Sequence, residues 1–223
     1  MKHEVICYFD DMENIGSSTG LSHMWHESWE KYGWSPMVSN YSWLKDHPAS
    51  DQMIAHVKTL PTINPRNYEE SCYLRWLPAQ TSNARLFTDM DTICNGLKPE
   101  DLEKLDQSKV NVLIKGGCPA AVYAPACFPF YEWILKYTKD HAIQENGQPH
   151  CSDQSMFIWL VQNKKDVFVD VDLCKEYGDK GWDFSPLIHF ATGSVARFGD
   201  GKNKREVIKQ WLDYKRYSIK ANA

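Results

Sequence analysis

The feature that most limits the fold of this chain is the alternation of short apolar runs with longer segments of helical periodicity. The runs that we expect to be strands are 5–9, 34–39, 85–88, 110–114, 121–123, 167–171 and 187–190. Between them lie segments that we expect to be helices, namely 21–32, 48–60, 67–77, 130–141, one starting at 152 or 153, and 204–217. Strands that alternate with helices are typical of layered α/β folds with a mainly parallel sheet.

Local signals set several of the expected helix boundaries. Pro48 and Pro61 bracket one helix, and Gly33 ends the first. Asn67, with Glu70 three residues later, predicts the N-terminal cap of the helix over 67–77.

Composition limits the class of protein. The chain has 223 residues, of which 43% are hydrophobic and 24% charged, so collagen-like and disordered classes are excluded. We expect one domain over 1–223, either alone or as the N-terminal part of a longer protein. The nine tryptophans are compatible with sugar-ring platforms and equally with large core side chains.

The seven cysteines are widely spaced and form no C-x-x-C pair, which indicates neither a disulfide framework nor a zinc knuckle. The N-terminus has no signal-peptide pattern, and no apolar stretch reaches the roughly 18 residues of a membrane span. We therefore expect a soluble protein in the cytoplasm, or in the host cytoplasm if it is viral.

A formal net charge of -4 argues against a general nucleic-acid-binding protein. Residues 197–223 are the exception, because their Lys and Arg outnumber their acids by eight to three. That segment is read either as a solvated helix or as a basic rim beside a phosphate-bearing site.

Polar residues follow several of the expected strands. In open α/β sheets, ligands bind beyond the carboxyl ends of the strands. This rule points to Asp10, Ser39, the pair Asp89 and Asp91, and the surroundings of His189.

Two D-x-D patterns occur in the chain. Around Asp170 and Asp172, valines alternate with the acids, which is typical of a strand with one solvent-exposed face. Asp89-Met90-Asp91 instead follows the apolar run Leu86-Phe87-Thr88, so both acids come after the strand. Paired carboxylates in a turn suit a hard divalent cation that also binds substrate phosphates.

Five different sequence blocks occur along the chain in a definite order. They are the W-x3-W-x2-Y-G-W segment from Trp25 to Trp34, the helix with Arg75 and Trp76, the strand ending in Asp89-Met90-Asp91, the Ser152-Asp153-Gln154 helix start, and His189 followed by Gly193. This order resembles nucleotide-sugar glycosyltransferases of the GT-A fold, over roughly residues 5–200. The small size also resembles the compact transferase domain of chlorella-virus glycosyltransferases.

The resemblance implies a three-layer α/β/α sandwich of GT-A type that binds a nucleoside-diphosphate sugar, which we expect to be a UDP-sugar. It implies that Asp89 and Asp91 hold Mn²⁺ or Mg²⁺ against the donor diphosphate, with His189 as the third protein ligand. The family pattern places Gly three residues after this His and Lys three residues later. Here Gly193 follows His189 by four positions, and Arg197, the implied phosphate partner, follows by four more.

The same resemblance implies roles for four other positions. Asp153 would lie near the reacting sugar or the acceptor hydroxyl, although Asp is also a good helix cap. Arg75 would reach the donor, although a surface arginine that extends past Trp76 to solvent would give the same sequence pattern. Tyr8 and Asp10 would bind the base, and Ser39 ends the next strand of the nucleotide site.

We therefore expect a metal-dependent glycosyltransferase that acts on a carbohydrate or glycan acceptor, with the stereochemical outcome open. A divalent ion and basic side chains offset the charge that builds on the diphosphate leaving group.

Three alternatives stay open. The segment from Phe87 to Ile93 superficially resembles the nucleophile strand of haloacid-dehalogenase-type phosphatases, with Thr92 one position early. A nucleotidyltransferase would need a Gly-rich phosphate loop, for which 16–20 is a poor match. A non-catalytic carbohydrate-binding domain would use the tryptophans as platforms.

Overall fold

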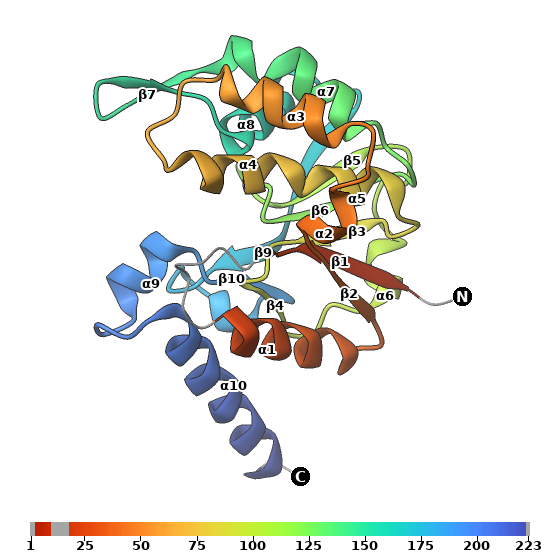
Figure 1. The fold of residues 1–223 in the computed structure, drawn as a ribbon. Coiled ribbons are helices and arrows are strands. Elements are labelled where there is room, and N and C mark those ends of the chain that lie inside the picture. Colours follow the sequence, from red (N-terminus) through yellow and green to blue (C-terminus); the bar gives the residue numbers. More distant parts are fainter. Residues whose placement is uncertain (1–2, 10–17, 222–223) are drawn as a thin grey trace.

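The fold is built on an eight-stranded sheet in which six strands run in the same direction (Figure 1). The computed structural model describes residues 3–9 and 18–221. The strands are β1 (Glu4–Tyr8), β2 (Ser35–Ser39), β3 (Leu86–Thr88), β4 (Thr92–Cys94), β5 (Val110–Ile114), β6 (Ala121–Tyr123), β9 (Phe168–Glu176) and β10 (Leu187–His189). Their order is β2-β1-β3-β6-β5-β9-β10-β4, and β6 and β4 are the antiparallel members. The prediction of a mainly parallel sheet is confirmed.

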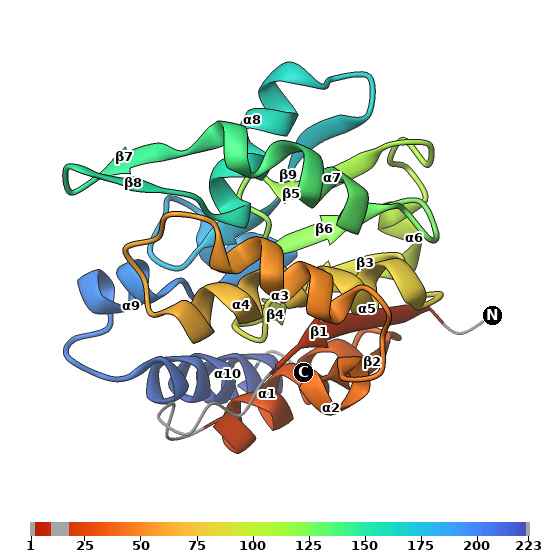
Figure 2. The same cartoon turned by 45° about the horizontal axis from the view of Figure 1, so that its top comes forward.

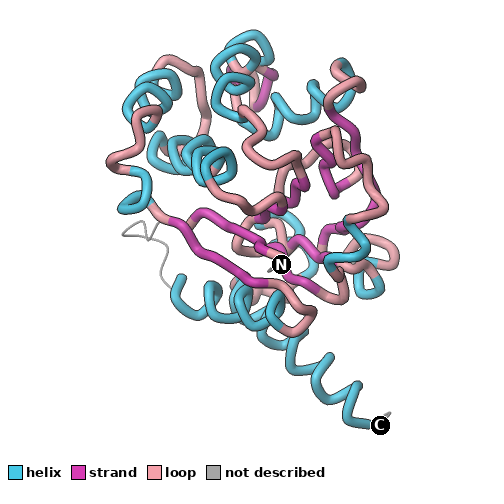
Figure 3. Tube along the Cα trace, turned by 90° about the vertical axis from the view of Figure 1, so that its right-hand side faces the viewer, coloured by secondary structure: helices cyan, strands magenta, loops and turns pink. Residues whose placement is uncertain are grey.

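Helices cover both faces of this sheet, which gives three layers (Figures 1 and 3). One face carries α1 (Ser18–Glu30), α9 (Thr192–Phe198) and α10 (Lys204–Ala221). The other carries α3 (Ser50–Lys58), α4 (Arg66–Leu74), α5 (Trp76–Thr81), α7 (Phe130–Tyr137) and α8 (Asp153–Asn163). The short helices are α2 (Tyr41–Leu44), α6 (Pro99–Leu102) and the 3-10 turns Lys139–His141 and Trp182–Phe184. A separate hairpin of β7 (Ile143–Glu145) and β8 (Gln148–His150) projects from the upper layer (Figure 2).

Side-chain alternation along the strands divides the buried residues into two cores. In β1, Val5 and Cys7 pack with the α1 and α10 side, whereas Ile6 packs with the α3 to α8 side. In β3, Leu86 and Phe87 divide in the same way. Because successive strand residues point to opposite faces, short apolar runs of this kind need cover on both sides, and the helical layers supply it.

The helix predicted over 67–77 is wrong at both ends. It begins at Arg66 after Pro65, so Asn67 is not its cap, and it stops at Leu74 before α5 begins at Trp76. Pro78 explains the break, because its ring would clash with the carbonyl of residue 74 in a continuous helix. The break leaves Arg75 at the junction of the two helices.

The tryptophans of the first helix region brace the segment that follows β3. The indole of Trp25 donates to the Thr88 hydroxyl at 3.0 Å, and that of Trp29 to the Thr92 carbonyl at 3.3 Å. Trp34 donates to the Leu97 carbonyl at 2.8 Å. All three are buried, so the tryptophan-rich block fixes the chain around 88–97 instead of forming an exposed platform.

Among the described residues, no helix has both the length and the apolar character that crossing a membrane requires.

We expect Trp25→Phe to lower the free energy of unfolding by about 1–3 kcal/mol, because it removes the indole donor and leaves the buried Thr88 hydroxyl without it. Trp43→Phe is the matched control, since Trp43 is 59% exposed. Urea denaturation measures both. Equal losses in the two variants would contradict the bracing role of Trp25.

Candidate functional site

The Asp89-Met90-Asp91 segment forms a tight turn at the carboxyl end of β3. The turn closes with a hydrogen bond from the Thr92 amide to the Asp89 carbonyl at 3.0 Å. The Asp89 amide donates to the Ala120 carbonyl and the Phe190 amide to the Asp91 carbonyl, each at 2.9 Å. Met90 is buried between the two acids. Hydrogen bonds to two neighbouring segments therefore hold the backbone of the acidic turn in place.

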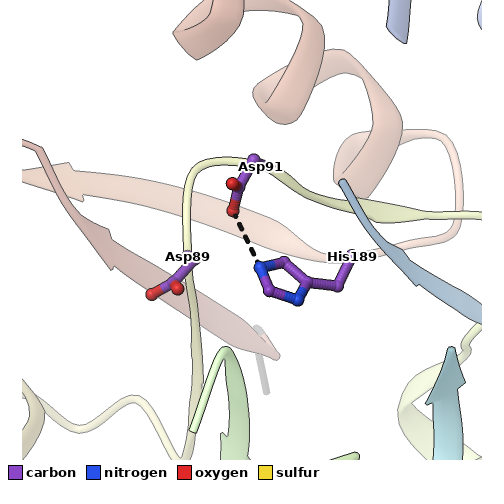
Figure 4. Close-up of side chains that lie close together, drawn as sticks. All are labelled: Asp89, Asp91 and His189. Atoms are coloured by element: carbon purple, nitrogen blue, oxygen red, sulfur yellow. Dashed lines mark ion pairs between the residues drawn. The ribbon is translucent and has the colours of Figure 1, made fainter. Parts of the chain in front are cut away.

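The structure brings Asp89, Asp91 and His189 together (Figure 4). One potential ligand atom from each lies within 4.8 Å of the others. His189 ends β10, which pairs with β4 so that His189 stands opposite Thr92, and its Nε2 lies 3.5 Å from Asp91 Oδ1. His189 is buried, and its Nδ1 has no hydrogen-bond partner. Two carboxylates and an imidazole are a donor set that suits Mn²⁺ and, less strongly, Mg²⁺.

Arg75 contacts both Asp89 and Asp153, and 78 positions separate Arg75 from Asp153 in the chain. Its Nη1 contacts Asp89 Oδ1, and its Nε and Nη2 donate to Asp153 Oδ2 at 3.0 and 2.6 Å. The Trp76 indole donates to the same Asp153 oxygen at 3.0 Å. The cap of α8 is Ser152, whose hydroxyl accepts from the Ser155 amide, so Asp153 is not the helix cap. Its buried carboxylate belongs to the site cluster instead.

Lys204 is a member of the site that the sequence does not single out. It begins α10, and its Nζ contacts Asp91 Oδ2. Arg197, the basic residue that the resemblance indicates, lies in the last turn of α9 with its guanidinium 5.5 Å from the Phe198 ring centroid, and it is exposed. The signal for Lys204 is weak in the sequence, because it is one of eight basic residues in 197–223.

The two acids of the turn have opposite electrostatic environments. Burial raises the pKa of Asp89, Arg75 opposes the rise without cancelling it, and the nearby Asp91 carboxylate adds to it. Burial also acts to raise the pKa of Asp91, but the charge of Lys204, together with that of His189, outweighs it and lowers this pKa. Without a further cation, the turn therefore disfavours one of its two negative charges.

The remaining predicted residues surround the ends of β1 and β2. Tyr8, Arg75 and Asp89 line one small cavity of about 10 Å³. Ser39 is buried, and its hydroxyl donates to the Cys7 carbonyl at 3.1 Å. Asp10 lies outside the described residues.

The second D-x-D pattern has a structural explanation. Asp170 Oδ2 accepts a hydrogen bond from the Gly116 amide at 2.8 Å. Asp172 is exposed and pairs with Lys175 at 3.2 Å. These two acids therefore provide control positions for experiments on Asp89 and Asp91.

No family model matches the chain, and no curated protein matches its sequence. Among solved structures, the apo form of mouse xyloside xylosyltransferase 1 is similar over 87% of this chain and 99% of that chain, with 8% identity and a TM-score of 0.59. The chain has the GT-A fold. The fold prediction made from the order of the sequence blocks is thereby confirmed.

Two further structures are similar at a TM-score of 0.49. One is a glycosyltransferase involved in the glycosylation of the major capsid of PBCV-1, with 9% identity over 95% of this chain and 99% of that chain. The other is the apo-form glycosyltransferase GlyE of Streptococcus pneumoniae TIGR4, with 12% identity over 96% of this chain and 64% of that chain.

We expect opposite effects on stability from neutralising the two acids that Arg75 joins. Asp153→Asn should lower the free energy of unfolding by about 3 kcal/mol, because it breaks a buried ion pair. Asp89→Asn should raise the melting temperature of the metal-free protein at pH 7, because burial and Asp91 disfavour the Asp89 carboxylate.

The rise in melting temperature that we expect from Asp89→Asn should depend on pH. A folded pKa above the unfolded value means that ionised Asp89 destabilises the fold at every pH above that raised pKa. The gain should therefore shrink as the pH falls from the raised pKa towards the unfolded value of about 3.9. Melting curves of both variants and the parent between pH 3.5 and 8 measure this, and a gain that grows on acidification would contradict it.

Proposed function

We propose that this chain is a glycosyltransferase that moves a sugar from a nucleoside-diphosphate sugar, a UDP-sugar in the first instance, to a carbohydrate acceptor. The observation that carries the proposal is the convergence of Asp89, Asp91 and His189 at the carboxyl edge of the sheet. The GT-A fold agrees with it, and the similar mouse structure is itself that of a xylosyltransferase. A shared fold does not assign an activity, so the proposal rests on the residues of the site.

The three residues would hold a divalent cation, Mn²⁺ or Mg²⁺. When bound, this cation stabilises the negative charge that develops on the diphosphate leaving group. Asp91 and His189 already face each other, while Asp89 is oriented by Arg75. The chain thus supplies the donor set from two separate segments, the acidic turn and the end of β10, while the α4–α5 junction supplies the Arg75 that orients Asp89.

Cationic side chains near the acidic turn are proposed to act on the donor. Arg75, which contacts Asp89 and lies close to Tyr8, would orient the sugar or the phosphate. Lys204 would leave Asp91 for a donor phosphate oxygen, because a bound divalent cation compensates the Asp91 charge in its place. We keep Arg197 as a second proposed phosphate partner.

Asp153 is the proposed catalytic residue. Three N–H groups, two from Arg75 and one from Trp76, converge on its Oδ2 and fix the position of the carboxylate. A fixed carboxylate beside the metal cluster suits orientation of the acceptor hydroxyl in either stereochemical outcome.

The nucleotide base is proposed to bind near Tyr8 at the end of β1, beside Ser39 at the end of β2. Asp10, which lies outside the described residues, stays a proposed base-binding residue on the strength of the resemblance. Tyr8 offers a partly exposed aromatic ring beside the site cavity, which suits stacking on a base. A location in the cytoplasm remains a prediction from the cysteine pattern.

The alternatives receive no comparable support. A phosphatase would use Asp89 as a nucleophile, but its carboxylate is bound by Arg75. A binding domain with tryptophan platforms needs exposed indoles, and of the nine tryptophans Trp43 is the exposed one in the part of the chain that the structure describes.

The proposal predicts Mn²⁺-dependent binding of UDP and release of UDP from at least one UDP-sugar. Asp91→Asn and His189→Gln should each weaken Mn²⁺-dependent UDP binding by tenfold or more and should abolish UDP release, because each removes one of three metal ligands. Calorimetric titration with UDP in the presence of Mn²⁺, and UDP release across a panel of UDP-sugars, measure this.

Asp172→Asn is the matched control for this experiment, since it neutralises one acid of the other D-x-D pattern. It should bind UDP and turn over like the parent. If Asp91→Asn behaves like Asp172→Asn, or if no UDP-sugar is turned over by the parent, the proposed function is wrong.

Lys204→Met should separate the two roles assigned to this lysine. Binding of Mn²⁺ alone should become tighter, because Asp91 loses its competing ammonium, whereas UDP binding in the presence of Mn²⁺ should weaken by about tenfold, because a charge-assisted contact is lost. Titration of Lys204→Met and Arg197→Met in parallel compares the two cations. A Lys204→Met protein that binds UDP as the parent does would contradict the phosphate role.

A further inference from the structure

A cavity of about 350 Å³ lies next to Asp153, outside the metal cluster. Its walls come from three elements that lie near one another in the upper layer, namely α4, the β7–β8 hairpin and the start of α8 (Figures 1 and 2). Glu69 and Tyr68 line it from α4, and His150 lines it from the hairpin. Because Asp153 also lines it, the cavity adjoins the proposed catalytic residue.

Two of the residues that line this cavity each have a buried polar atom with no hydrogen-bond partner. Glu69 is 1% exposed, and its Oε1 accepts from Asn64 at 2.6 Å while its Oε2 accepts from nothing. His150 is 4% exposed, and its Nδ1 has no partner either. Buried polar groups are nearly always paired, and an unpaired one is costly. Two such atoms, on residues that line the same cavity, point to a ligand that completes the pairing after small side-chain rotations.

The surrounding charges restrict the chemistry of that ligand. Glu69, Glu145 and Asp153 all line the cavity, so an anion is disfavoured there. A metal ion is disfavoured as well, because in the described part of the chain the cluster with converging metal-ligand atoms is that of Asp89, Asp91 and His189. A neutral molecule with adjacent hydroxyl groups fits, because one hydroxyl can donate to Glu69 Oε2 while another pairs with His150 Nδ1.

The other wall residues agree with a ring-shaped polyol. Tyr68 is 49% exposed and offers an aromatic surface, and Ile158 offers an apolar one. A sugar ring has both apolar C–H faces and hydroxyl edges, so it would meet both kinds of surface.

We propose that this cavity binds a sugar ring, with Glu69 and His150 recognising two of its hydroxyl groups. This inference rests on the proposed function for its choice of a sugar as ligand. The ring belongs either to the nucleotide-sugar donor or to the carbohydrate acceptor, and the hydroxyl chemistry is the same in both cases.

The test compares Glu69→Gln with Glu70→Gln, because Glu70 is the next residue of α4 and does not line the cavity. Both variants remove one negative charge from the same helix. Glu69→Gln retains an oxygen for Asn64 and replaces the unpaired acceptor with a donor. His150→Gln is the second variant.

Three readouts identify the source of the sugar. They are the KM for UDP-sugar in hydrolysis without acceptor, the KM for methyl glycosides of glucose, galactose, xylose and mannose as acceptors, and binding of these glycosides by saturation-transfer NMR. We expect Glu69→Gln and His150→Gln to raise one of the two KM values by about tenfold with a smaller change in kcat, and Glu70→Gln to change each by less than about twofold. A rise in the hydrolysis KM assigns the donor sugar, and a rise in the acceptor KM alone assigns the acceptor.

Failure of this inference is distinguishable from failure of the proposed function. If the parent turns over a UDP-sugar and the folded Glu69→Gln and His150→Gln proteins keep both KM values and glycoside binding, the sugar cavity is wrong and the transferase stands. If the parent turns over no UDP-sugar but binds a glycoside that Glu69→Gln does not bind, the cavity stands and the transferase is wrong.

Discussion

Three carboxylates meet at the carboxyl edge of the sheet, and the arrangement of the site depends on how their charge is balanced. Arg75 lies between Asp89 and Asp153, and Lys204 contacts Asp91. These ion pairs tie together the acidic turn, the α4–α5 junction, the start of α8 and the start of α10. Removing buried charge from water is costly, so the elements that bring the cations also determine which packing is stable. The same excess of negative charge prepares the turn for a divalent cation.

Much of this arrangement is predictable from the sequence, because it follows from strand ends. Short apolar runs give strands, parallel strands bring their carboxyl ends to one edge, and the polar residues after them must meet. Asp89, Asp91 and His189 are brought together in this way although about 100 residues separate the acids from the histidine. The alternation of valine with aspartate around Asp170 likewise predicts a strand and not a second site.

What the sequence does not predict depends on side-chain reach and on breaks within elements. Lys204 gives no local signal, because its role arises from where α10 begins relative to Asp91. Arg75 is indicated by the resemblance, but its place at a helix junction, from which it contacts both Asp89 and Asp153, depends on the break that Pro78 causes. The cavity with Glu69 and His150 depends on the β7–β8 hairpin, which hydrophobic periodicity does not indicate. Its Asn146-Gly147 turn, with positive φ at both residues, is a hairpin signal in the sequence that the strands expected above do not include. The tryptophans illustrate the same limit, since their hydrogen-bonding indoles are core braces here and not sugar platforms.

In the proposed site, a divalent cation held by Asp89, Asp91 and His189 replaces Lys204 as the positive charge on Asp91. Diffraction at the manganese absorption edge from crystals grown with Mn²⁺ and UDP locates the cation and the lysine together. We expect one anomalous peak within ligand distance of these three side chains, with Lys204 Nζ moved from Asp91 towards the diphosphate. An anomalous peak elsewhere, or UDP bound while Lys204 still contacts Asp91, would overturn this arrangement.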